Sequence, residues 1–183
     1  MLTVPGLCWL CRMPLALAHW WLCSCCARNI PLNVPVCPRC ALPALSRTLP
    51  CGRCLQKMPP WQQMITVSGY TPPLSQLMHQ MKFSRRPELA QPLARLLLLA
   101  VREARRTRPL PSPDMLVNVP LWQRRQWRRG YNQSDLLCRR LAHWLGCRYE
   151  PAALRRTRMT RIQHQLSARL RKRNLKNAFR LEL

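Results

Sequence analysis

The sequence predicts two parts of different kinds, a small cysteine-rich domain followed by an α/β domain. Nine of the eleven cysteines lie between Cys8 and Cys54, and the other two are isolated in a region of ordinary apolar periodicity. Beyond residue 60, segments patterned like strands alternate with segments patterned like helices, which is typical of α/β folds. We therefore expect one domain over residues 1–58 and a second over residues 61–183.

The cysteines of the first part form four Cys-x-x-Cys pairs. Eleven, ten and ten residues separate successive pairs, enough for a hairpin that brings one pair to face another. Two residues between cysteines place both thiolates on one side of a turn, where they fit two corners of a zinc tetrahedron. Because four thiolates leave no position for water, we expect two structural zinc ions. The predicted ligands are Cys8, Cys11, Cys23, Cys26, Cys37, Cys40, Cys51 and Cys54.

The residues leave the grouping of these ligands open. Sequential grouping would form one site from the first two pairs and another from the last two, whereas interleaved grouping would cross them. Cys25 is one thiol too many, and it could replace Cys26 if the local turn is tighter. A disulfide scaffold is the main alternative to zinc, but it needs an oxidising compartment, and no export signal is visible. Bound metal would supply much of the folding free energy of this segment.

The composition is strongly basic, with 31 Lys and Arg against six Asp and Glu and a formal net charge of +25. Such an excess repels itself, so an anionic partner would bind with strong salt dependence. DNA, RNA and phosphorylated metabolites all qualify. The longest apolar run, Leu96 to Val101, is far shorter than the roughly 20 residues of a membrane-spanning helix. The apolar start lacks the basic segment of a secretory signal, so we expect a cytoplasmic protein without a membrane span.

The second part begins with one predicted strand and two predicted helices. Ile65 to Tyr70 alternates apolar and small or polar residues, as a half-buried strand does. Apolar residues then recur at helical spacing from Leu74 to Met81 and from Leu89 to Val101. Pro92 either kinks the second helix or marks its start.

A second strand, a basic loop and a third helix are predicted next. Met115 to Val119 is apolar enough for a buried strand. Trp122 to Gln133 is rich in donors and aromatics and has few helix signals, so we expect a loop, with Asn132 or Ser134 capping the helix that follows. Open α/β sheets bind anions at such loops. The ten Lys and Arg between Arg155 and Arg180 predict either a loop that orders over a polyanion or a solvated basic helix.

Several motifs together resemble the ComF family, specifically its GntX branch. The cysteine pairs are followed by LMHQMKF at residues 77–83, Val-Pro-Leu at 119–121, Arg-Gly-Tyr-Asn-Gln at 129–133, and the segment from Gln163 to Phe179. The pairs alone would be unspecific, but their order with the later motifs is highly specific, and the resemblance covers essentially the whole chain. It implies an N-terminal double zinc ribbon and a phosphoribosyltransferase-like domain with a Rossmann-like parallel sheet. It also implies a protein associated with DNA uptake, competence or the use of external DNA.

The resemblance further implies partners and contacts. The DNA-uptake machinery would supply protein partners, and the ligand would be DNA or an anion like phosphoribosyl pyrophosphate. The loop after the 119–121 strand would lie near the pyrophosphate, and Arg158 to Asn174 resembles the flexible loop that covers the site. The residues matched to phosphate-side contacts are Lys82, Pro120, Arg129, Asn132, Gln133, Arg158, Arg173 and Asn174.

The chain departs from the family after its last motif. Relatives continue with a strand, two consecutive acids and a Thr-Thr-Gly-Ser-like turn that hold the ribose and the 5-phosphate, whereas this chain stops at Leu183 and has no two adjacent acids. Without them a phosphoribosyl group would be attracted but not oriented. We therefore expect a domain that is incomplete at its C-terminus, less stable than its relatives and not catalytic by itself.

Two other functions stay open. In the first, the protein is a zinc-dependent module that binds single-stranded DNA, with Trp9, Trp61, Trp122 and Trp127 available to stack on unpaired bases. The same aromatics could equally pack inside the protein. In the second, a partner supplies the missing loop and the transferase is active.

Overall fold

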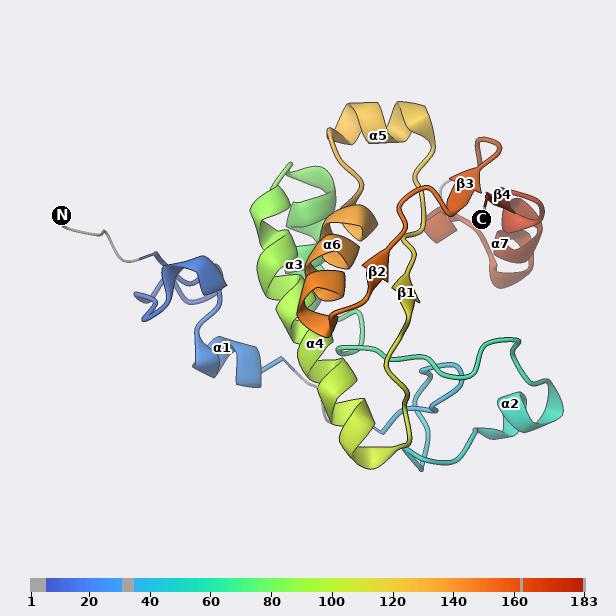
Figure 1. The fold of residues 1–183 in the computed structure, drawn as a ribbon, viewed down its shortest axis with the longest axis horizontal. Coiled ribbons are helices and arrows are strands. Elements are labelled where there is room, and N and C mark those ends of the chain that lie inside the picture. The colour runs from blue at the N-terminus through green and yellow to red at the C-terminus, as the bar shows by residue number, and fades with distance from the viewer. Residues whose placement is uncertain (1–5, 31–34, 162, 183) are drawn as a thin grey trace. The chain divides into compact units, whose positions relative to one another are not determined.

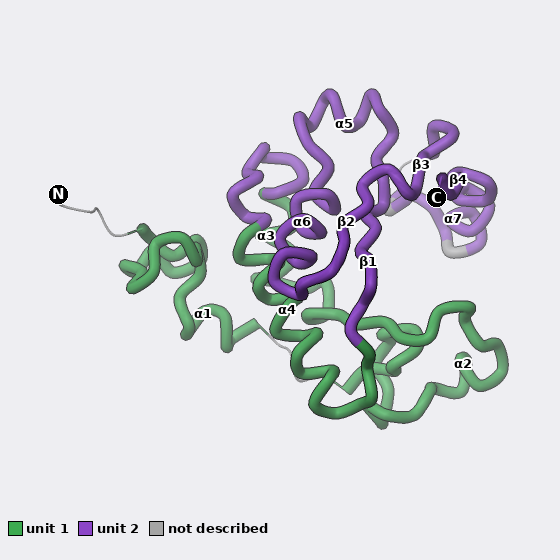
Figure 2. The backbone as a smooth tube through the Cα atoms, viewed as in Figure 1, with its two compact units in different colours: residues 1–80, 91–111 green, residues 81–90, 112–183 purple. Residues whose placement is uncertain are grey.

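The computed structural model of the chain describes residues 6–30, 35–161 and 163–182. The chain folds into two compact units (Figure 2). Unit 1 contains the cysteine-rich part and extends well past residue 60, where the composition changes. Leu183, on which the expectation of an incomplete domain depends, lies outside the described residues. The stretches are Met1–Gln80 and Gln91–Pro111 in unit 1, and Met81–Ala90 and Ser112–Leu183 in unit 2.

The cysteine-rich part of unit 1 repeats one local structure twice. In each copy an isolated antiparallel bridge, Leu7 with Pro14 or Val36 with Pro43, flanks the first cysteine pair. A short helix then carries the second pair at its start, and these helices are α1 and α2 (Figure 1). A hairpin followed by a helical turn is a zinc-ribbon-like arrangement, which is what the family resemblance implies; the spacing of the cysteines predicts the hairpin. The helices span Ser24–Arg28 (α1) and Gly52–Gln56 (α2), and a 3-10 turn, η1, spans Ala18–Trp20.

Two longer helices follow, where the sequence predicts them. α3 (Leu74–Phe83) buries Leu77 and Met81 of its predicted apolar stripe. α4 (Ala90–Thr107) has Pro92 in its first turn, where a missing backbone N–H breaks no intrahelical bond. Pro92 therefore marks the start of the helix and does not interrupt it. A 3-10 turn, η2, precedes α4 at Pro87–Leu89.

The strand predicted over residues 65–70 is wrong, because this segment has no regular structure. Its alternating pattern meets one requirement of a strand. A strand also needs a neighbour for its backbone hydrogen bonds, and none pairs with it within the described residues. Just before the segment, Met64 donates its backbone N–H to the carbonyl of Pro38 at 2.8 Å, which ties the chain to the second cysteine set.

Unit 2 contains a small parallel sheet covered by a helix, which confirms the coarse α/β prediction. β1 (Met115–Leu116) pairs in parallel with β2 (Arg148–Tyr149), and β1 is shorter than the predicted 115–119. α6 (Gln133–Leu145) joins the strands and contacts both of them (Figure 1). Strand, helix and parallel strand thus form one βαβ unit. The paired residues are Met115 with Arg148 and Leu116 with Tyr149.

The loop predicted over residues 122–133 contains a helix, so that prediction is wrong. α5 (Gln123–Arg129) has no buried residue, so the apolar stripe by which helices are usually recognised is missing. Gln and Arg are good helix formers by intrinsic propensity. Gly130, at φ 86°, ends the helix in the left-handed conformation that glycine adopts easily.

The basic segment near the end of unit 2 folds into a pair of strands with a helix between them in sequence. β3 (Leu154–Arg156) pairs antiparallel with β4 (Phe179–Leu181), and α7 (Ala168–Leu175) lies between them in sequence. Thr160 and Ala178 are buried. The segment therefore includes a basic helix, as one of the two predictions had it, but strands at both ends hold that helix in place. A 3-10 turn, η3, spans Gln163–Gln165.

The described helices include none that is both long enough and apolar enough to cross a lipid bilayer.

Candidate metal centres and candidate anion site

The structure gathers eight cysteines into two groups of four, in the sequential arrangement. Within each group the sulfur atoms all lie within 4.8 Å of one another. The interleaved grouping that the residues left open is not the arrangement seen. The groups are Cys8, Cys11, Cys23 and Cys26, and Cys37, Cys40, Cys51 and Cys54.

The spacing between sulfur atoms fits a tetrahedral zinc ion. With Zn–S bonds of about 2.3 Å, two thiolates at tetrahedral corners lie about 3.8 Å apart. The Sγ atoms of Cys11 and Cys23 lie 3.7 Å apart, as do those of Cys40 and Cys51. The donor set, four thiols without carboxylate or imidazole, also suits zinc. Both groups could therefore hold a metal ion such as zinc.

Backbone geometry around the first pair of each group explains how the thiols converge. Arg12 and Ala41, each directly after the second cysteine of its pair, adopt positive φ angles of 62° and 57°. This left-handed residue closes a tight turn and returns the chain along itself. Across the group, the backbone N–H of Cys23 points to the Sγ of Cys8 at 3.4 Å. The equivalent contact in the second group, from Cys51 to Cys37, is 3.2 Å long.

The two groups share the same electrostatics. Burial would raise the pKa of Cys8, but backbone N–H groups of Cys11, Cys23 and Leu10 outweigh it and lower that pKa to about 6. The pKa of Cys37 is likewise lowered to about 6. In the same group as Cys37, burial and the neighbouring sulfurs raise the pKa of Cys54 to about 12. Four thiolates this close repel one another, and a divalent cation removes that repulsion.

Cys25 lies outside the first group and is exposed. The chain enters α1 with Cys23 as the N-cap residue, and the N–H of Cys26 points to the Sγ of Cys23 at 3.3 Å. One helical turn therefore directs Cys23 and Cys26 to the same side, and Cys25 projects from a different face of the helix. Cys25 does not replace Cys26 in the group.

Three of the predicted phosphate contacts lie together in unit 2. The Arg129 guanidinium donates to Oε1 of Gln133, one turn further along the chain. Burial, and then the positive charge of Arg129, lower the pKa of Lys82. Burial also lowers the pKa of Arg129, whose guanidinium lies over the ring of Phe83, 5.7 Å from its centre. Two partly buried cations that repel each other gain stability from a bound anion.

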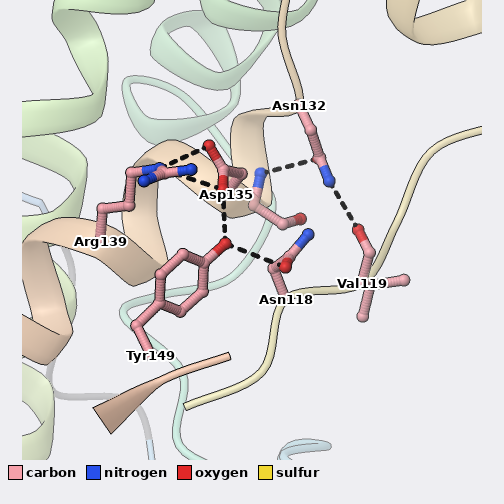
Figure 3. Close-up of polar contacts among 7 residues, drawn as sticks. Asn118, Val119, Asn132, Asp135, Arg139 and Tyr149 are labelled. Carbon is pink, nitrogen blue, oxygen red and sulfur yellow. Dashed lines mark hydrogen bonds and ion pairs between the residues drawn. The ribbon is translucent and has the colours of Figure 1, made fainter. Parts of the chain in front are cut away.

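Asn132 and Pro120 shape the backbone beside these cations. Oδ1 of Asn132 accepts from the N–H of Ser134 at 3.1 Å, so of the two predicted caps Asn132 is the one used. Its Nδ2 donates to the carbonyl of Val119 at 3.0 Å (Figure 3). The carbonyl of Pro120 accepts from Arg156 at 3.3 Å. Both predicted residues therefore position the loop between β1 and α6.

Of the remaining predicted contacts, Arg158 lies in the loop that leads into α7, and Arg173 and Asn174 lie in α7 itself. Nη2 of Arg158 donates to the carbonyls of Lys176 and Asn174, at 2.6 and 3.2 Å. The side-chain amide of Asn174 bonds both backbone groups of Arg161, each at 3.0 Å. Arg173 is exposed. In this structure Arg158 and Asn174 fasten the loop, and their hydrogen bonds do not join them to Arg129 or Gln133.

Sequence reasoning missed a polar network that joins the segment after β1 to β2 and α6 (Figure 3). The Tyr149 hydroxyl lies 2.9 Å from Oδ1 of Asn118 and 2.5 Å from Oδ1 of Asp135. Asp135 also forms an ion pair with Arg139 at 2.9 Å. Burial, and then Asp135, raise the pKa of Tyr149. The available signal was Asn118 itself, a polar residue inside an apolar run.

These features define a class of protein. It is a basic chain in which a repeated four-cysteine unit of metal-binding geometry accompanies a βαβ unit with partly buried cations beside its connecting loop.

Comparison with known proteins narrows the class. Over all 183 residues the chain is 67% identical to the DNA utilization protein YhgH of Salmonella typhi and 66% identical to that of Escherichia coli strain K12. In both cases the alignment covers 81% of the relative. Competence protein F of Haemophilus influenzae is 42% identical over 171 residues, which are 93% of this chain and 74% of that protein. The chain belongs to the ComF family.

No protein-family model matches the chain. No solved structure matches it either.

Proposed function

We propose that this protein acts in the use of external DNA. The observation that carries the proposal is its identity of 67%, along the whole chain, with a protein named for DNA utilization. The net charge of +25 supports it, because DNA is a polyanion. A cytoplasmic location and contact with DNA-uptake proteins belong to the same proposal.

Complementation tests this role. Escherichia coli K12 lacking its own DNA utilization protein is given this chain and grown with DNA as the sole carbon source, with growth on glucose as control. We expect this chain to restore growth on DNA. Soluble, zinc-loaded protein that leaves growth unchanged would overturn the proposal.

We further propose that each four-cysteine group holds one structural zinc ion. Support comes from sulfur pairs 3.7 Å apart, close to the spacing of tetrahedral zinc ligands, and from the all-thiol donor set. When bound, zinc would cross-link the hairpin and the helical turn of each repeat. Elemental analysis of reduced protein should find two equivalents. Protein that folds without metal, or with its cysteines joined in disulfides, would contradict this assignment.

For unit 2, we propose a phosphoribosyltransferase-like domain in which Lys82, Arg129 and Gln133 bind a phosphate group. The hydrogen bond from Arg129 to Gln133 and the lowered pKa of Lys82 support this part. Pro120 and Asn132 shape the adjoining loop, and Arg158, Arg173 and Asn174 would approach the ligand if α7 and the loop before it move together. Calorimetric titration with phosphoribosyl pyrophosphate tests it. Arg129→Met should weaken binding at least tenfold, and the exposed control Arg140→Met should not.

A second candidate function, binding of single-stranded DNA, is favoured by α5. Trp127 is 81% exposed, and four arginines and no acid share its seven-residue helix. Exposed aromatics between cations serve as stacking platforms for unpaired bases. Quenching of tryptophan fluorescence by an oligonucleotide, measured at two salt concentrations, tests this function. Trp127→Ala should weaken binding about tenfold and Trp127→Phe much less, whereas equal losses would argue against stacking.

A further inference from the structure

Unit 1 contains a cavity that none of the functions above uses. Its volume is about 550 Å³, within the range of roughly 300 to 1,000 Å³ that is typical of small-molecule sites. Three segments wall it: the hairpin of the second cysteine group, residues 64–69, and the second half of α4 with Arg108 beyond it. All three belong to unit 1.

Most of the lining of this cavity is apolar. Side chains from each of the three segments contribute, so an occupant would meet hydrocarbon around most of its body. A cavity of this size and lining suits a small molecule and is too small for a polymer. The apolar lining residues include Val36, Pro43, Ile65, Val67, Leu99 and Ala100.

The charged side chains of the lining are mostly cationic. Four arginines line the cavity against one acid, Glu103, and that acid already forms an ion pair with Arg106 at 3.8 Å. Water inside the cavity could accept hydrogen bonds from the arginines but would not neutralise their charge. An anion would do both. The arginines are Arg47, Arg102, Arg106 and Arg108.

Arg108 marks the place where such an anion would bind. Its Nε and Nη1 are buried and have no hydrogen-bond partner within the described residues. The Oγ of Ser68, which lines the same cavity, is also buried without a partner. Buried donors normally find an acceptor, and charge-assisted hydrogen bonds from a guanidinium to a carboxylate or phosphate oxygen are stronger than those to a neutral acceptor.

We propose that this cavity binds a small organic anion, with its oxyanion group on Arg108 and Ser68 and its apolar body against Val67 and Leu99. The ligand class is an aromatic or aliphatic carboxylate or phosphate monoester. Its lining residues belong to unit 1, whereas the cations beside α6 belong to unit 2, so the two candidate sites share no residue.

Two fluorescent probes that differ chiefly in charge test the proposal on the full, zinc-loaded chain. 8-Anilinonaphthalene-1-sulfonate is an anion with an apolar body, and N-phenyl-1-naphthylamine is its uncharged counterpart. We expect saturable binding of the sulfonate. Arg108→Met should weaken it at least tenfold, which corresponds to about 1.4 kcal/mol. The same variant should bind the uncharged probe within twofold of the parent.

Two further variants separate this site from general attraction to a basic surface. Arg140→Met removes the same charge from an exposed side chain outside the cavity, and it should change sulfonate binding less than threefold. Ala100→Trp should fill the cavity and weaken both probes. Circular dichroism and a zinc content of two equivalents confirm folding of each variant. Equal effects of Arg140→Met and Arg108→Met, or no saturable binding by the parent, would overturn the proposal.

Competition then identifies the anionic group. Benzoate and phenyl phosphate share an aromatic body and differ in the oxyanion. Displacement of the sulfonate probe by either compound supports the site and names its preferred group. Displacement by neither, at concentrations where the parent is saturated by the probe, counts against it.

Discussion

Asn132 offers the sharpest test of how the βαβ unit is held together (Figure 3). Its side chain makes two separate hydrogen bonds: Oδ1 accepts from the first turn of α6, and Nδ2 donates to Val119 beyond β1. Removing an N-cap costs about 1 kcal/mol, and a lost intramolecular hydrogen bond costs about the same. Asn132→Ala should therefore lower the free energy of unfolding by about 2 kcal/mol. Asn132→Ser keeps a capping oxygen and loses only the donor, so it should cost about 1 kcal/mol.

Urea unfolding followed by circular dichroism, with zinc saturating, measures both costs. The urea midpoint should fall in the order parent, Asn132→Ser, Asn132→Ala, with an unchanged slope, because the surface exposed on unfolding is the same. Equal midpoints for the two variants would show that the cap contributes nothing. Losses below about 0.5 kcal/mol in both would refute the two-bond account altogether.

Three further predictions concern separate parts of the chain. Burial and the Asp135 carboxylate raise the pKa of Tyr149, so as pH rises a tyrosine in the unfolded chain ionises first, near pH 10. The free energy of unfolding should therefore fall as pH rises beyond about 10. Tyr149→Phe should lessen that fall, as measured by urea titrations at alkaline pH. Cys37→Ser should reduce bound zinc from two equivalents to one by elemental analysis, whereas Cys25→Ser, which changes an exposed thiol outside the groups, should leave it at two. Arg39 donates to the carbonyl of Trp61 at 2.8 Å, so Arg39→Ala should speed hydrogen exchange at the Trp61 indole, which donates back to the carbonyl of Arg39.

The two four-cysteine groups could be predicted from sequence because their geometry is local. A Cys-x-x-Cys turn brings two sulfurs together by itself, so pairs at even spacing specify most of a site before any tertiary contact forms. What spacing could not decide was the grouping. The grouping depends on which pair the chain returns to. Here the first pair meets the second, and the third meets the fourth.

Elements held by side-chain burial were predictable, and elements held by other forces were not. α3 and α6 carry apolar stripes that pack inward, so periodicity reveals them. α5 buries nothing, and only its helix-forming residues and the glycine at its end support it. Residues 65–70 show the opposite error. Their alternation predicts a strand, but a strand exists only if another strand accepts its hydrogen bonds, and the pattern of one segment carries no information about its neighbour.

The candidate anion site shows the same limit at the level of single residues. Lys82 and Arg129 come from segments about fifty residues apart in sequence, and by charge alone both count as ordinary surface cations. The fold buries Lys82 and brings the charge of Arg129 near it, and these two effects lower the pKa of Lys82. Asn118, Asp135 and Tyr149 meet only because a parallel strand pair and its connecting helix close into one βαβ unit. Sequence therefore identifies cations and polar residues, and topology decides which of them form a site. It follows that a substitution weakening the β1 and β2 pairing should disturb the environment of Lys82 less than a substitution in α5, which carries Arg129.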